Sequence, residues 1–167
     1  MISIGFGTNR KWTSCLIRWA TGSEYSHVWV EYESSVWGGT WVAHAGPKGV
    51  VKETQENVYK KYPKHRIYDF SGDLTKGLHA VKGDVGADYD YRSVIWNGLL
   101  LVLYTATRWN YLHSLVTRNT SKLSCSEFVA KILKECGVEG TETFDPELTT
   151  PGDLERFCAH SDHFWVV

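Results

Sequence analysis

The most constraining feature of the chain is a pair of alternating segments on either side of a Gly-Gly pair. Residues 26–33 read SHVWVEYE, and residues 40–45 read TWVAHA. Successive side chains of a strand point to opposite faces, so the valines of the first segment share one face and His27 lies on the other. Two such strands joined by a tight turn form an antiparallel hairpin. The chain therefore has to fold around an antiparallel sheet with at least one covered face.

The remaining patterns predict more strands around this hairpin and helices mainly in the second half. Short apolar or alternating runs predict strands at 2–6, 50–53, 64–70 and 163–167. Helical spacing and capping signals predict helices at 12–21, 73–82, 91–106, 124–136 and 149–158. The 167 residues are typical of one domain. We expect a single α+β domain over residues 1–167, with a small antiparallel sheet or barrel and with Cys15 and Cys136 in its core.

Composition and charge exclude several classes of function. The formal net charge is -1, which gives no field for binding nucleic acid. No signal peptide precedes the first strand, and the four cysteines form no CxxC pair, so we expect a cytoplasmic protein with reduced thiols.

The apolar stretch 94–106 is too short to span a bilayer, and we expect a buried helix there. Membrane contact through 94–106 is the less favoured alternative, and the sequence does not indicate an oligomeric state.

Cys125 is the first candidate for chemistry. It follows Ser124, and Ser124 with Glu127 forms a capping box, so the thiol should lie in the first turn of a helix. Unpaired N–H groups there stabilise negative charge by about 0.3–2 kcal/mol, which is too little to ionise a thiol at neutral pH. With an imidazolium partner we expect the pKa of Cys125 to fall below about 7. The alternative is a small buried residue of the core.

His27 and His44 are the candidate partners of this thiol. They lie on the two strands of the predicted hairpin, on the same face, and should be close enough to touch. His44 would then orient His27 as the third member of a catalytic triad does. Tyr25 could line the cleft as a substrate-binding residue, and a packed aromatic is the alternative. Cys158 with His160 and His163 offers too few ligands for metal, so we expect no metal and no cofactor.

Several segments together resemble a known family. The matching pieces are IRWATGSEYSHVWVEY, WVAHAGPKGVV, YDY, CSEFVAKIL and TPGDLERF. They resemble the circularly permuted NlpC-type cysteine hydrolases, papain-like enzymes related to the lecithin:retinol acyltransferase group. The resemblance covers roughly 2–54 and 87–157. In that family the histidine strand precedes the cysteine helix, which packs on a small antiparallel sheet or barrel. The resemblance implies Cys125 as nucleophile, His27 as base and acid, and His44 as the orienting residue.

The function expected from these residues is thiol hydrolysis. Cys125 would form an acyl-enzyme with a peptide amide, in a substrate such as a cell-wall (peptidoglycan) peptide. One alternative is a lipid acyl hydrolase or acyltransferase that uses the same thiol. Another is a catalytically silent binding module with the same fold. The expected partner is thus a peptide or acyl substrate.

Overall fold

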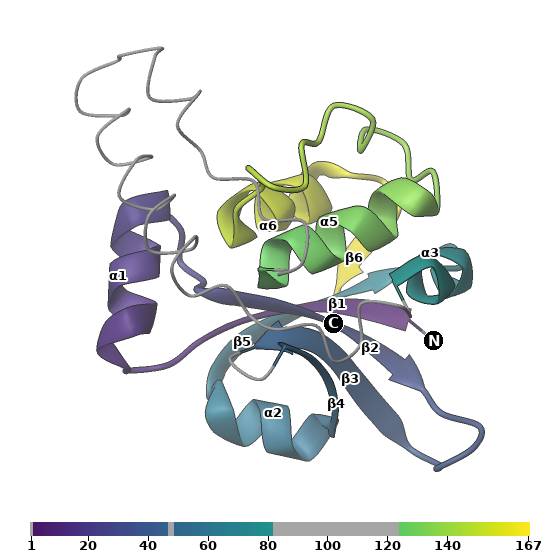
Figure 1. Cartoon of the computed structure of the whole chain (residues 1–167), viewed down its shortest axis with the longest axis horizontal. Helices are drawn as coiled ribbons and strands as arrows, with labels where there is room; N and C mark the ends of the chain where they lie inside the picture. Colours follow the sequence, from purple (N-terminus) through teal and green to yellow (C-terminus); the bar gives the residue numbers. More distant parts are fainter. Residues whose placement is uncertain (1, 47–48, 82–123) are drawn as a thin grey trace.

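The computed structural model describes residues 2–46, 49–81 and 124–167, which form an α+β structure. Its strands are β1 (Ile2–Thr8), β2 (His27–Glu33), β3 (Thr40–Gly46), β4 (Gly49–Thr54), β5 (Lys64–Phe70) and β6 (Phe164–Val166). Its helices are α1 (Trp12–Thr21), α2 (Gln55–Lys61), α3 (Thr75–Ala80), α5 (Cys125–Glu135) and α6 (Pro151–His160). Figure 1 shows the sheet as a curved layer between α5 and α6 on one side and α2 on the other.

The strands form one open antiparallel sheet in the order β4-β3-β2-β1-β5-β6. The hairpin predicted from the alternating segments is confirmed, because β2 pairs with β3 and Val30 lies opposite Ala43. Every predicted strand is present within one or two residues of its expected bounds. The strands β4 and β6 remain as edges, so the described residues form a sheet rather than a closed barrel.

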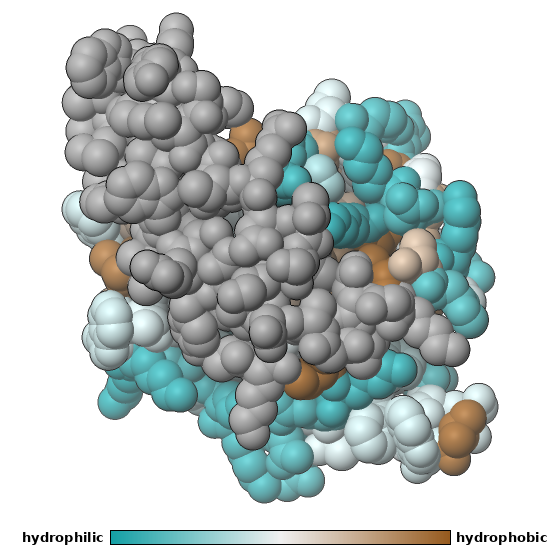
Figure 2. All heavy atoms as spheres, in the orientation of Figure 1, coloured by the Kyte–Doolittle hydropathy of each residue, from teal (hydrophilic) through white to brown (hydrophobic). Residues whose placement is uncertain are grey.

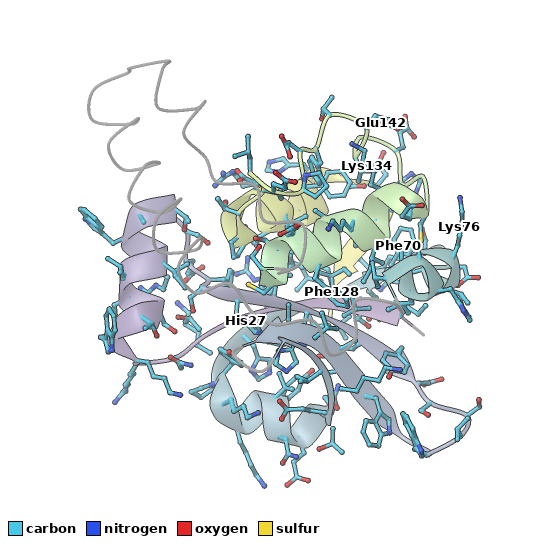
Figure 3. The ribbon with its side chains drawn as sticks, viewed as in Figure 1. His27, Phe70, Lys76, Phe128, Lys134 and Glu142 are labelled. Carbon is cyan, nitrogen blue, oxygen red and sulfur yellow. The ribbon has the colours of Figure 1, made fainter. Side chains whose placement is uncertain are left out.

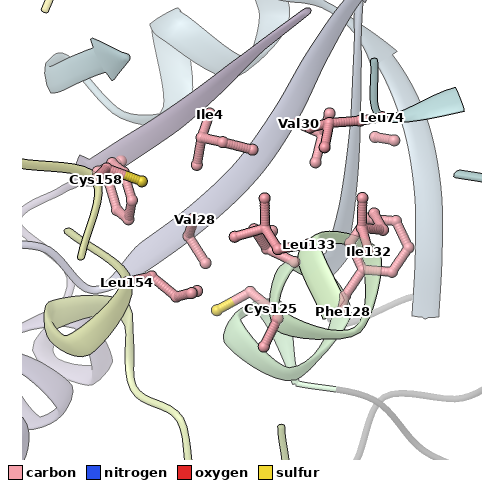
Figure 4. Packing of buried hydrophobic residues seen from close by; sticks show 14 of the residues in the cluster. Ile4, Val28, Val30, Leu74, Cys125, Phe128, Ile132, Leu133, Leu154 and Cys158 are labelled. Atoms are coloured by element: carbon pink, nitrogen blue, oxygen red, sulfur yellow. The ribbon is translucent and has the colours of Figure 1, made fainter. Parts of the chain in front are cut away.

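The main core lies between the sheet and the helices α5 and α6. Valines 28 and 30 of β2 pack there against Phe128, Leu133 and Leu154, all almost fully buried. Figure 4 shows these side chains between the strands and the first turns of α5. The apolar face of β2 inferred from alternation is therefore the face that α5 covers. This packing positions the start of α5 beside the start of β2.

The opposite face of the sheet is also covered, which the sequence did not predict. Helix α2 connects β4 to β5, and Trp29 is fully buried in a second cluster with Val42 and Val58. The indole lies directly over Gly5, where an added Cβ would be 2.2 Å from Trp29 Cε2. Glycine in β1 therefore makes room for the tryptophan of β2. As a result, residues on the polar face of β2 are buried as well.

Helix α1 has the expected bounds but not the expected packing. Gly22 ends it in the left-handed conformation at a φ of 60°. The prediction that Cys15 lies in the core is wrong, because this residue is exposed. The prediction for Cys136 holds only in part: the residue is half-buried, and its sulfur accepts a hydrogen bond from the Gly77 N–H at 3.1 Å.

Two sequence predictions concern residues outside the described ranges. The helix expected at 91–106, with the apolar stretch 94–106, lies there, as does the YDY piece of the family resemblance. Among the residues that the structure does describe, no helix is long and apolar enough to cross a membrane.

Candidate active site

The capping box predicted at the start of α5 is present in full. The Ser124 hydroxyl accepts a hydrogen bond from the Glu127 N–H at 3.1 Å, and the Ser124 N–H donates to Glu127 Oε2 at 3.4 Å. The cap fixes Cys125 as the first residue of the helix. The position of the thiol at a helix N-terminus is therefore confirmed.

The environment of Cys125 differs from the expectation. The side chain is only 5% exposed and packs in the main core with Val28 and Leu154; Figure 4 shows its sulfur directed toward Leu154. Burial raises the pKa of the Cys125 thiol to about 11, although the backbone N–H groups of Val28, Ser126 and Cys125 itself act to lower it. The expected pKa below 7 is wrong, because loss of hydration disfavours the thiolate more than these amides favour it.

The two histidines of the hairpin lie together, as the sequence predicted. His27 Nε2 and His44 Nδ1 are 3.0 Å apart, and both rings are buried. The His27 ring also stacks on Tyr62, with ring centroids 4.7 Å apart. Figure 3 shows His27 between α5 and α2. The pair is held by one hydrogen bond and by aromatic packing from the α2 side of the sheet.

Glu53 extends this pair and was missed in the sequence. Its Oε1 lies 3.2 Å from His44 Nε2, and Lys61 Nζ lies 2.6 Å from the same oxygen. The alternation of the strand predicted at 50–53 could have identified it. Val51 pairs with His44, and Glu53 is the next residue on the same face of β4. The structure thus contains a chain of contacts from His27 through His44 and Glu53 to Lys61.

The ionisation of Glu53 assigns the protons along this chain. Burial raises the pKa of Glu53, but Lys61 and His44 lower it more, so the carboxylate is ionised at neutral pH. Burial lowers the pKa of His44, and burial together with His44 and Lys61 holds the pKa of His27 well below its usual value. Both imidazoles are therefore neutral at pH 7.

When two neutral imidazoles are linked in series to a carboxylate, their protons can be placed on the ring nitrogens in only one way. His44 must donate from Nε2 to Glu53, so its Nδ1 is an acceptor. His27 must then donate from Nε2 to His44. The Nδ1 of His27 is left with a lone pair, which is what a general base requires.

The thiol and this base lie on opposite faces of β2. Among the hydrogen bonds of the described residues, none joins Cys125 to His27. The sulfur faces the backbone N–H of Val28, the residue next to His27. The side chains of Val28 and His27 point to opposite faces of β2, and Cys125 packs on the Val28 face. The structure therefore joins His27 to His44 and brings Cys125 only to the adjacent backbone.

Tyr25 lies in the core beside this region. It is 3% exposed, its ring centroid is 6.0 Å from that of Phe6, and the Arg66 guanidinium lies 6.0 Å from the Tyr25 ring centroid. Burial raises the pKa of its hydroxyl. These contacts are those of a packed aromatic, and its role in binding a substrate stays a prediction.

A separate polar cavity of about 430 Å³ opens on the α2 side of the sheet. Its lining includes Glu31, Tyr59 and Asp69 but none of the three predicted catalytic residues. Glu31 is buried and accepts hydrogen bonds from Trp29 Nε1 and Gln55 Nε2, each at 2.7 Å. The carboxylate is thus engaged in structural bonds, and the candidate active site lies elsewhere, at the start of β2.

Comparison with known proteins does not extend this description. No protein-family model matches the chain, and no curated protein matches it. The resemblance to permuted NlpC-type hydrolases therefore depends on the short sequence pieces quoted above.

Proposed function

We propose that this chain is a papain-like thiol hydrolase with the histidine strand before the cysteine helix. The observation that carries the proposal is the 3.0 Å contact between His27 and His44, continued to Glu53, next to a capped helix that begins at Cys125. Two buried imidazoles bonded to a half-buried carboxylate have no packing advantage over apolar residues, because burial penalises each polar group. It does supply an oriented base.

The proposed reaction starts from a neutral thiol and a neutral imidazole. The reaction requires the start of β2 to rearrange, because the Cys125 sulfur packs on the Val28 face and the His27 ring lies on the other face. Once the two groups meet at a substrate carbonyl, Nδ1 of His27 takes the thiol proton. The sulfur forms a bond to the carbonyl carbon, and the carbonyl electrons move to oxygen. Backbone N–H groups at the start of α5 stabilise this oxyanion.

The same groups complete the cycle. The tetrahedral adduct expels the amine, which receives the proton held by His27, and an acyl-enzyme remains on Cys125. His27 then removes a proton from water, and the resulting attack releases the carboxylic acid and restores the thiol. While His27 is an imidazolium, its Nε2–H remains bonded to His44, and the Glu53 carboxylate offsets the added positive charge.

The substrate class that we propose is a peptide amide, with a cell-wall peptide as the first candidate. Lipid acyl donors undergo the same chemistry with the same thiol, so both classes belong in the test. A second candidate function is a silent binding module. Two observations favour it: the pKa of Cys125 is about 11, and no hydrogen bond joins the thiol to His27.

Intact-protein mass spectrometry with activated acyl donors distinguishes these functions. Peptidyl and fatty-acyl thioesters should each be offered to the wild type, to Cys125→Ser and to His27→Ala. An enzyme should gain one acyl mass at Cys125, and His27→Ala should slow this step by roughly 10²–10⁴-fold. The preferred donor identifies the substrate class. Equal acylation rates of the wild type and His27→Ala would show that His27 is not the general base, and would support the silent module.

A further inference from the structure

Helix α1 has its apolar face turned away from the protein. Trp12 and Trp19 are 69% and 70% exposed, and Leu16 between them is 40% exposed. The buried position of the helix is a serine: Ser14 faces inward and donates to Asn9 Oδ1 at 2.7 Å. An ordinary surface helix has the reverse arrangement, with apolar residues inside and polar ones outside. The outward face of α1 therefore needs a partner.

The charged residues of α1 and of the segment just before it are all positive. Arg10 and Lys11 precede the helix, Arg18 lies in its last turn, and no acidic residue occurs from Asn9 to Ser23. Among the carboxylates that the structure describes, none lies within salt-bridge distance of these three cations. A partner for this face should thus be both apolar and anionic.

The position of the helix leaves this face accessible. Figure 1 shows α1 at the left margin of the described residues, on the opposite side from α3. At the same margin in Figure 2, pale and brown residues form the surface, in contrast to the teal residues over α2.

We propose that α1 docks the protein onto an anionic lipid bilayer, with Trp12, Leu16 and Trp19 in the interface. Indole rings prefer the boundary between headgroups and acyl chains, and nearby lysine and arginine are attracted to anionic headgroups. A helix with this composition lies in the plane of the membrane. A second copy of the chain fits less well, because a two-fold contact through α1 would bring two sets of cations together. This inference does not depend on the proposed hydrolase activity.

Vesicle flotation tests the proposal with the full chain. Vesicles of phosphatidylcholine mixed with phosphatidylglycerol should carry the protein to the top of a density gradient at low salt. Binding should decrease with added salt and with pure phosphatidylcholine. The double variant Trp12→Ser/Trp19→Ser should reduce the partition coefficient by roughly tenfold or more. The charge variant Arg10→Glu/Lys11→Glu should reduce it by a similar factor.

Two matched variants control for general effects of composition. Trp37→Ser removes another exposed tryptophan, 59% exposed on the β2–β3 turn, and Lys76→Glu reverses an exposed charge on α3. Both should float as the wild type does. A dye on Cys15, which is exposed on α1, should shift to the blue with anionic vesicles.

Three results would overturn the proposal. In the first, the wild type does not float with either kind of vesicle. In the second, both α1 variants float as well as the wild type. In the third, sedimentation shows a dimer that the tryptophan variant dissociates, which would make a second copy the partner of α1.

Discussion

The buried thiol of Cys125 makes a prediction about stability and pH. Its folded pKa of about 11 lies above the ordinary thiol value of 9.0, so the folded state holds the proton more tightly than the unfolded chain. The resulting stabilisation is fully present below pH 9 and is lost as the pH rises from about 9 to about 11. We expect the free energy of unfolding of the wild type, relative to Cys125→Ala, to decrease over this range in urea titrations.

The opposite trend would identify a thiolate. If Cys125 formed an ion pair with His27, its folded pKa would lie below that of the unfolded chain. The advantage of the wild type would then increase with pH up to the unfolded pKa. The sign of the slope between pH 8 and pH 10 therefore distinguishes the two states without knowledge of a substrate.

Glu53 makes a second prediction at this scale, concerning the tautomers of the two histidines. Because the carboxylate accepts from His44 Nε2, both His44 and His27 should carry their protons on Nε2 at pH 7. Nitrogen-15 NMR correlations of the imidazoles measure this directly. Glu53→Leu should produce mixed tautomers in both rings, whereas Glu53→Gln should keep much of the preference through its amide oxygen.

His160 serves as the internal control for that measurement. It is exposed on α6, and its Nδ1 bonds to the Arg156 carbonyl. Helix α6 contacts β6, at the opposite edge of the sheet from the β4 strand that carries Glu53. Its signals should not change in the Glu53 variants. A wild-type His44 protonated on Nδ1 would reverse the direction of the chain and exclude His27 Nδ1 as the base.

At the scale of elements, the N-cap of α5 should affect both the free energy of unfolding and the reactivity of the Cys125 thiol. Ser124→Ala removes an N-cap and should reduce the free energy of unfolding by about 1 kcal/mol. Thr150→Ala removes the equivalent cap of α6, where the Thr150 hydroxyl accepts from the Asp153 N–H at 3.2 Å, and should have a similar effect. Only Ser124→Ala should also increase the alkylation rate of Cys125. Equal alkylation rates in the two variants would mean that the cap does not position the thiol.

The contact between β1 and Trp29 gives a second test of an element. Gly5→Ala would place a Cβ 2.2 Å from Trp29 Cε2, so the indole must move. We expect a loss of about 1–3 kcal/mol in chemical denaturation. The same change in a Trp29→Val background should cause a much smaller loss, because the clash is absent. An unchanged loss would mean that Gly5 is required for some other reason.

For the whole molecule, burial predicts the order in which the four thiols react. Cys15 is exposed, Cys136 is half-buried, and Cys125 and Cys158 are buried. A disulfide reagent at pH 8 should therefore modify Cys15 rapidly, Cys136 more slowly, and Cys125 and Cys158 more slowly still. Cys15→Ser should remove the fast phase. Fast modification of Cys125 in the native protein would contradict the packing around α5.

The sequence by itself determined the local elements and several of their faces. Strict alternation identified β2 and β3, and it put His27 and His44 on one face, because side-chain direction in a strand depends only on the backbone. The Ser124–Glu127 capping box identified the first residue of α5 for a similar reason, since its partners are three residues apart. These features depend on neighbours in the chain.

Only the tertiary structure decided the properties that depend on distant segments. Helix α2 buries the polar face of β2, so Trp29 and Glu31 lie inside, although alternation alone required only one covered face. The pKa of Cys125 is raised because Val28 and Leu154 surround the sulfur and exclude water, which no helix signal indicates. Helix α1 was predicted correctly as a helix, but its orientation was not, because helical periodicity defines an apolar face and not the direction in which that face points.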